Sequence, residues 1–183
     1  MSEYLISWGW SKARIWSGGL PDFETIPTIF AERDYPQSSL VRTGHAFVGL
    51  EIFLAQGGKF GYGLLGAEYK PEDGDQLTVR VPVNEVSGDR LDWAISSRMI
   101  EPRQGLPPEY TSSVFEGVER YLATSCEIGG GTLCFSHSVH SNVGSSISLF
   151  RNISSSLVEI IAKMPMDELD MAKIAEKWCT KAR

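Results

Sequence analysis

The apolar residues of this chain change their spacing in a fixed order along the sequence, and that order limits the folds that it can adopt. Residues 77–86 (LTVRVPVNEV) alternate between apolar and polar, which is typical of a strand with one buried face. The spacing becomes helical over residues 107–125, returns to strand-like over residues 132–139 and is helical again over residues 147–161. This succession predicts an α+β fold, in which helices lie on one face of a mostly antiparallel sheet.

Four further segments fit the same sheet. Residues 4–10, 43–54 and 91–100 are rich in apolar residues at strand-like spacing and are predicted to be strands. Residues 57–75 are rich in glycine and turn-forming residues, so we interpret them as a hairpin region. The strands are therefore expected to form antiparallel hairpins before the first helix begins.

Local signals place the helices more closely. Pro107 and Pro108 belong at the start of the first helix, where a missing N–H group costs nothing. Ser145 or Ser146 can cap the second helix. A third helix is predicted over residues 167–181, because its acids come first and its lysines last, as the helix dipole favours. The predicted apolar stripes of the first two helices are Tyr110, Val114, Val118, Tyr121 and Leu122, and Ile147, Phe150, Ile153, Leu157 and Ile161.

The length of the chain, 183 residues with 42% hydrophobic residues, suits one domain with its own core. We divide it into an aromatic-rich N-terminal extension that packs on the core (1–40), a core domain (41–164) and a C-terminal helix (165–183). Either extension could cover an open sheet face or mediate contact with a protein partner or a second copy, and we favour covering within the chain. Trp8 and Trp10 are expected on one face, covering a sheet edge or the end of the core, with stacking on bases or sugars as the alternative.

The composition disfavours several classes of protein. No apolar run reaches the roughly 18 residues that a membrane span needs, so no membrane partner is expected. No positively charged segment precedes the apolar residues of the N-terminus, so no secretion signal is expected and the predicted location is cytoplasmic. A formal net charge of −6 argues against wrapping duplex nucleic acid by bulk electrostatics, although a local basic patch could still hold RNA.

The chain contains three cysteines, and their odd number suggests reduced thiols rather than disulfides. Cys126, Cys134, His137 and His140 raise the question of a zinc site. However, zinc sites usually begin with a close cysteine pair, and here seven residues separate the two. The odd offset from Cys134 to His137 would also place these side chains on opposite faces of a strand. Neither a metal nor another cofactor is predicted.

The sequence shows no recognisable catalytic constellation. Cys134, Ser136 and His137 could supply a nucleophile and a base, but no nucleophile elbow or triad context surrounds them. Glu116 and Glu119 most simply form a solvated helix face. The Gly-x-x-x-x-Gly-Lys-Ser/Thr phosphate loop of GTPases is absent from the sequence. We therefore predict a binding protein that is not an enzyme.

Two segments together resemble domain IV of elongation factor G. The segment GLPPEY leading into VFEGVERYL is similar to the start of the first helix of that domain, and HSNVGSSISLFRNISSS is similar to its histidine loop and second helix. The strand LTVRVPV fits the family strand that precedes them. The shared residues of the second segment are His140, Ser145, Ser146, Phe150 and Ser155. The resemblance covers residues 76–163 firmly and 41–75 weakly, and it does not extend to 1–40 or 166–183.

The resemblance implies a two-layer α/β sandwich with a left-handed β-α-β crossover, a core shared with a small-subunit ribosomal protein and with the GHMP kinases. In the elongation factor, loops at one end of this domain enter the decoding site of the small ribosomal subunit. The matching segments here are 57–75, RQGLPPEY and HSVHSNVG. The implied function is a binding module without a GTPase domain that contacts the ribosome or structured RNA. Its implied contact residues are Lys59, His137, His140 and Asn142.

The chain also departs from this family. The loop that carries His140 is one residue longer than the family pattern. The region 57–75 contains acidic residues that would repel RNA phosphates. These acids are Glu68, Glu72, Asp73 and Asp75.

Two alternative functions remain open at this point. The first is a phosphate-binding or kinase-like relative of the same fold, in which Gly144, Ser145 and Ser146 form an anion-binding helix start. The further motifs of the GHMP kinases are not found, and capping is the simpler interpretation of these serines. The second is a protein-interaction or oligomerisation scaffold that uses residues 1–40 or the C-terminal helix.

Overall fold

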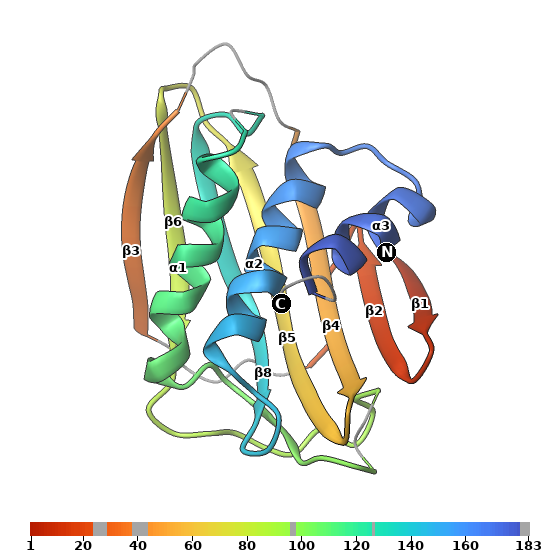
Figure 1. Cartoon of the computed structure of the whole chain (residues 1–183). Coiled ribbons are helices and arrows are strands. Elements are labelled where there is room, and N and C mark those ends of the chain that lie inside the picture. Colours follow the sequence, from red (N-terminus) through yellow and green to blue (C-terminus); the bar gives the residue numbers. More distant parts are fainter. Residues whose placement is uncertain (24–28, 38–43, 96–97, 126, 180–183) are drawn as a thin grey trace.

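The computed structural model describes residues 1–23, 29–37, 44–95, 98–125 and 127–179. Within these residues the chain forms an eight-stranded sheet with three helices on one face (Figure 1), which confirms the α+β class and the mostly antiparallel sheet. The elements in chain order are β1 (Ser2–Trp8), β2 (Ser11–Ser17), β3 (Ile29–Pro36), β4 (Ala46–Gln56), β5 (Lys59–Pro71), β6 (Gln76–Val83), β7 (Pro102–Gln104), α1 (Pro108–Leu122), β8 (Gly131–Ser141), α2 (Ile147–Ala162) and α3 (Glu168–Cys179).

The strand order of the sheet is β1-β2-β4-β5-β8-β6-β3. Neighbours along this order are antiparallel except for β6 and β8, which run parallel. The short strand β7 pairs with the end of β8. Because α1 lies between β6 and β8 in the chain, these elements form a β-α-β unit whose two strands are direct neighbours.

The N-terminal extension joins the sheet rather than lying on it. β1 and β2 form a hairpin beside β4, and β3 adds a strand beside β6 at the opposite edge. Trp8 ends β1 and is half-buried, whereas Trp10 lies in the following turn and is 85% exposed. The prediction that both tryptophans share one covered face is wrong, because the strand ends between them.

The main core lies between the helices and the sheet. β6 buries Leu77, Val79 and Val81 there, as its alternating pattern predicts. The predicted stripe of α2 is buried as well, except at Ile147, the first residue of the helix, which is 49% exposed. The two central helices approach closely at Gly117, where an added Cβ atom would lie 2.3 Å from the backbone oxygen of Arg151.

The third helix packs against the second. Glu159 of α2 accepts hydrogen bonds from Lys177 Nζ at 2.7 Å and from Trp178 Nε1 at 2.5 Å. This confirms a C-terminal helix within the predicted range 167–181. Residues 180 and 181, like residue 43 of the predicted strand 43–54, lie outside the described residues.

A second apolar cluster lies on the opposite face of the sheet. Leu91, Ala94 and Ile100 from the β6–α1 connection pack there against strand residues that include Trp16 and Tyr62. The prediction of a strand at 91–100 is therefore wrong. Its described residues, 91–95 and 98–100, form turns and bends, because their apolar side chains cover a sheet face instead of extending the sheet, and residues 96 and 97 lie outside the described residues.

The hairpin region predicted over 57–75 is confirmed only at residues 57–58, which form the turn between β4 and β5, because residues 59–71 are the 13-residue strand β5 at the centre of the sheet. The glycines of β5 mark close contacts rather than turns. A Cβ atom added at Gly63 would lie 3.0 Å from Cδ1 of Ile153, and one added at Gly66 would lie 2.9 Å from Cδ2 of Leu20.

Candidate functional site

Three connections meet at one end of the sheet, which we call the tip (Figure 1). They are the β4–β5 turn (57–58), the β6–α1 connection (84–107) and the β8–α2 connection (142–146). Lys59 and Asn142, two of the residues predicted to contact RNA, both belong to the tip.

The acidic turn of residues 72–75 lies at the other end of the sheet. It follows Pro71, which pairs with Gly131 at the start of β8, whereas the tip follows the end of β8. The length of β5 therefore separates Glu72, Asp73 and Asp75 from Lys59. These acids do not oppose a ligand that binds at the tip.

The first feature of the tip is a hollow of about 410 Å³, which we call the aromatic hollow. Its floor includes Phe53 and Phe60, whose rings stack with centroids 5.6 Å apart and planes inclined by 20°. Among the described residues, no acidic side chain lines this hollow and its two lysines form no ion pair. The side chains used below are Trp10, Lys12, Phe53, Lys59, Phe60 and Met99.

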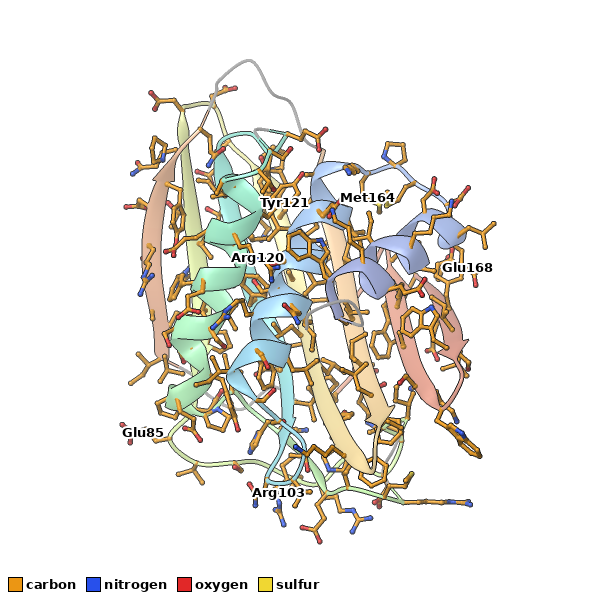
Figure 2. All side chains as sticks on the ribbon, in the orientation of Figure 1. Glu85, Arg103, Arg120, Tyr121, Met164 and Glu168 are labelled. Atoms are coloured by element: carbon orange, nitrogen blue, oxygen red, sulfur yellow. The ribbon has the colours of Figure 1, made fainter. Side chains whose placement is uncertain are left out.

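A second hollow, of about 430 Å³, shares Met99 with the first, and we call it the arginine hollow. Arg90, Arg98 and Asn142 line it together with Glu101. Arg90 pairs with Asp92 at 3.0 Å, whereas Arg98 has no ion pair within the described part of the chain. Arg103 projects at the same end (Figure 2). The two hollows are adjacent, because Met99 lines both, and we call them together the tip surface.

His140 does not belong to this surface. It is 3% exposed, its Nδ1 lies 2.9 Å from the backbone oxygen of Gly105, and its Nε2 lies 3.1 Å from Oγ of Ser87. Burial lowers the pKa of His140, which favours a neutral ring that donates from Nδ1 and accepts at Nε2. The predicted RNA contact of His140 is therefore corrected. This residue links β8 to the β6–α1 connection through its hydrogen bonds to Gly105 and Ser87.

His137 lies within β8, away from the tip. It pairs with Gly66, its Nδ1 lies 2.9 Å from Oγ of Ser136, and its ring meets Phe23 at a centroid distance of 5.0 Å. Burial lowers the pKa of His137. Because the ring is half-buried in the middle of the sheet, the predicted RNA contact of this residue is corrected as well.

The strand β8 contains an irregularity at this point. The pairing of β5 with β8 skips Ser136, so Cys134 pairs with Glu68 while His137 pairs with Gly66. Cys134 and His137 therefore share one face, and the prediction that they lie on opposite faces is wrong. Within the described residues, no group of three His, Cys, Asp or Glu side chains could hold a metal ion.

The predicted anion-binding helix start is held by contacts within the chain. Oγ of Ser146 accepts a hydrogen bond from the backbone N–H of Leu149 at 3.2 Å, which caps α2. Oγ of Ser145 donates to the backbone oxygen of Tyr62 at 2.8 Å. Gly144 adopts φ +107° and its carbonyl accepts from the N–H of Tyr62 at 3.0 Å. These contacts favour capping over phosphate binding.

A buried ion cluster lies behind the tip, on the face of the sheet opposite the helices. Glu51 of β4 is fully buried, and its Oε1 accepts from the hydroxyl of Tyr62 at 2.9 Å and from the N–H of Ile95 at 3.0 Å. Its Oε2 lies 3.6 Å from Nε of Arg14. Burial raises the pKa of Glu51, an effect that Ile95, Arg14 and Tyr62 partly offset.

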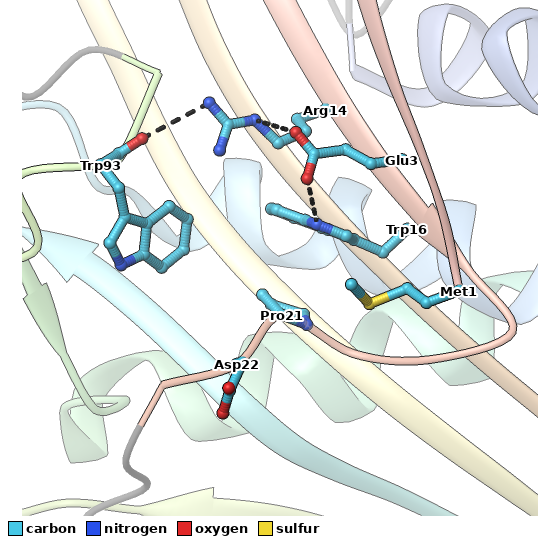
Figure 3. Close-up of a pocket in the computed structure, with 7 residues that line it drawn as sticks. All are labelled: Met1, Glu3, Arg14, Trp16, Pro21, Asp22 and Trp93. Atoms are coloured by element: carbon cyan, nitrogen blue, oxygen red, sulfur yellow. Dashed lines mark hydrogen bonds and ion pairs between the residues drawn. The ribbon is translucent and has the colours of Figure 1, made fainter.

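Arg14 connects this cluster to a small pocket of about 240 Å³ (Figure 3). Its guanidinium lies 5.6 Å from the ring centre of Trp16 and 5.7 Å from that of Trp93, and it donates to the backbone oxygen of Trp93 at 3.4 Å. Glu3 accepts from Nε1 of Trp16 at 3.1 Å and lies 3.5 Å from Arg14. Arg14 and Glu51 thus hold residues 93–95, from which the chain continues to Met99 on the tip surface.

Several residues of these sites were not found from the sequence. Arg90 and Arg98 were not identified as site residues, because Arg90 precedes the predicted strand 91–100 and Arg98 lies within it. Lys12 and Phe53 come from strands far apart in sequence, and only the sheet brings them together. The sequence did indicate Glu51 as a residue of interest, because an acid inside the apolar run LEIFL is expected to be buried with a partner.

Comparisons with known proteins give no relative. No protein-family model, no curated protein and no solved structure matches the chain. Among the described residues, no helix is both long and apolar enough to cross a membrane.

Proposed function

We propose that this chain is a non-catalytic binding module with a core of the elongation factor G domain IV type, and that its tip surface contacts RNA. The observation that carries the proposal is that the aromatic hollow and the arginine hollow lie side by side, with Met99 lining both. Together they present exposed aromatic rings beside Lys12, Lys59, Arg90 and Arg98.

The connection from β6 to β8 supports the proposed fold type. Seen from the helix side with β6 and β8 pointing down, the chain passes from β6 on the left, through α1 in front, to β8 on the right (Figure 1). This sense is left-handed, whereas about 98% of such connections are right-handed. The resemblance to domain IV implies this uncommon connection, so the two observations agree.

The chemistry of the tip surface suits an unpaired RNA segment better than a duplex. Unpaired bases stack on exposed aromatic rings, and each stacked base contributes about 1–3 kcal/mol. Trp10, which is 85% exposed, and Phe60, which is 39% exposed, offer such faces, and buried Phe53 supports the ring of Phe60 from beneath. Lys12 and Lys59 at the same hollow can neutralise phosphates. They form a local basic patch for RNA, although the net charge of the chain is −6.

The partner that we propose is ribosomal RNA of the small subunit, in the cytoplasm. This part of the proposal rests on the resemblance, because the loops of domain IV that enter the decoding site correspond to the tip. Lys59 and Asn142 remain proposed contacts, while His137 and His140 are replaced in this role by the cations and rings of the tip surface.

The test is fluorescence anisotropy with a labelled single-stranded RNA of about 12 nucleotides, which is within the site sizes of such proteins. We expect Trp10→Ala to weaken binding about 10-fold, the equivalent of about 1.4 kcal/mol for one lost stacked base. Lys12→Ala with Lys59→Ala should weaken binding and reduce its salt dependence. Lys70→Ala with Lys173→Ala removes equal charge away from the tip and should leave binding unchanged. Equal losses in both double variants would contradict the proposal.

A further inference from the structure

The two edge strands of the sheet differ in how they are protected against pairing with another strand. β3 carries Glu32, Arg33 and Asp34 and ends at Pro36. Arg33 pairs with Glu119 at 2.9 Å, and Glu32 pairs with Arg80 at 2.7 Å. Charged side chains and a terminal proline are the usual means by which natural proteins keep an edge strand from pairing.

β1 lacks this protection. Its one charged residue, Glu3, is engaged by Arg14 and Trp16 of β2, although half of its side chain remains exposed. Leu5 at the centre of the strand is 61% exposed, and Met1 before it is 72% exposed. In the described part of the chain β1 pairs with β2 alone, which leaves its outer backbone groups open.

Exposed apolar side chains flank this edge on the helix side too. α3 begins at Glu168 on the side of the sheet where β1 lies (Figures 1 and 2). Leu169, the next residue, is 69% exposed. One exposed apolar side chain of α3 therefore lies on this side of the sheet, between the exposed acids Glu168 and Asp170.

We propose that a second copy of this chain pairs with β1, antiparallel and about a two-fold axis at Leu5. This is the one register in which all seven residues of β1 find partners, because the strand runs from Ser2 to Trp8. Leu5 then faces Leu5 of the partner, Tyr4 faces Ile6, and Glu3 faces Ser7. No like charges oppose each other in this register, and apolar residues meet on both faces of the joined sheets.

A second copy fits this edge better than a growing fibre does. Head-to-tail addition would need β3 of one copy to accept β1 of the next, and the charges of β3 oppose that. A two-fold contact uses the same strand from each copy and closes as a dimer. The inference is independent of the proposed RNA contact, because the tip surface lies at the end of the strands and not along their edge.

The first test is sedimentation equilibrium of the whole chain, whose monomer mass is 20.2 kDa. We expect about twice that mass for the wild type. Leu5→Lys places two like charges opposite each other at the two-fold axis and should give a monomer, with a circular dichroism spectrum like that of the wild type. Ile29→Lys makes the same chemical change at the other edge strand, where Ile29 is 75% exposed, and should remain a dimer. A monomeric wild type, or a dimeric Leu5→Lys variant, would overturn the proposal.

A second test reads the register directly. Leu5→Cys brings two thiols opposite each other across the axis, within the reach of a disulfide, so mild oxidation should give a covalent dimer. Ser7→Cys places the two thiols four residues apart along the strand, about 13 Å, which a disulfide does not span. The wild type, with its native cysteines, provides the baseline. Equal cross-linking of the two variants, or none in Leu5→Cys, counts against pairing about Leu5.

Discussion

Gly117→Val is expected to lower the free energy of unfolding by about 3–5 kcal/mol. Overpacking of a close core contact costs about 1–3 kcal/mol, and each lost hydrogen bond costs about 1 kcal/mol more. A Cβ atom at this position would lie 2.3 Å from the backbone oxygen of Arg151 and 2.7 Å from Cβ of Ser154. Separation of α1 from α2 would also break the bonds from Ser154 to Val114 and from Ser155 to Gly117, both 2.8 Å long.

Urea unfolding of the variant measures this loss. Ser112→Val is the matched control, because it adds the same side chain to an exposed position of the same helix. The control should lose only a few tenths of a kcal/mol through the lower helix propensity of valine. If the two variants lose equal stability, the close approach of α1 and α2 is not the reason that position 117 requires glycine.

Glu51→Leu is expected to cost about 3–5 kcal/mol, the usual result of removing one partner from a buried ion pair. The substitution removes the acceptor for the Tyr62 hydroxyl and the Ile95 N–H and leaves the Arg14 guanidinium facing an apolar side chain. Arg14→Met added to Glu51→Leu should recover most of the loss, because the pair is then replaced by apolar groups. The measurement is urea unfolding of both variants. A double variant less stable than Glu51→Leu alone would contradict the account of this cluster.

Glu51→Gln isolates the pH dependence of the same cluster. Because burial raises the pKa of Glu51, the folded chain retains a proton that the unfolded chain releases as the pH rises above the ordinary value of 4.5. The wild type must therefore lose stability relative to Glu51→Gln from that pH upward, until the folded pKa is passed. Urea unfolding at pH 4.5 and pH 7 measures the difference. A wild type that gains stability relative to Glu51→Gln between pH 4.5 and pH 7 would show that the pKa of Glu51 is not raised.

The parts of the fold that could be predicted are those in which burial follows a local period. The alternation around Val79 and the helical spacing around Phe150 each reflect one buried face, so β6 and α2 were found. The segment around Ala94 has the same apolar content, but it covers a sheet face that only the assembled strands create. The glycines of β5 could not be separated from turn glycines, because their cause is the approach of Ile153 and Leu20 from distant parts of the chain.

Less of the candidate site than of the fold could be predicted, because the exposure of a residue also depends on distant parts of the chain. Lys59 and Asn142 lie at the tip because they flank turns between strong elements, and their contact with RNA stays a prediction. His137 and His140 are close to the same turn in sequence, yet strand β8 continues to Ser141, which buries the ring of His140 and leaves that of His137 half-buried within the sheet. Whether a polar residue near a turn reaches solvent depends on where the strand ends and on what covers it.

The most direct test of the central claim is co-sedimentation of the whole chain with small ribosomal subunits across a salt series. We predict binding that weakens as salt rises, because cations of the tip surface would release counterions from RNA. Lys12→Ala with Lys59→Ala should abolish or strongly reduce it, whereas Lys70→Ala with Lys173→Ala should not. Absence of binding at low salt, or equal binding by the two double variants, would contradict the claim that the tip surface contacts ribosomal RNA.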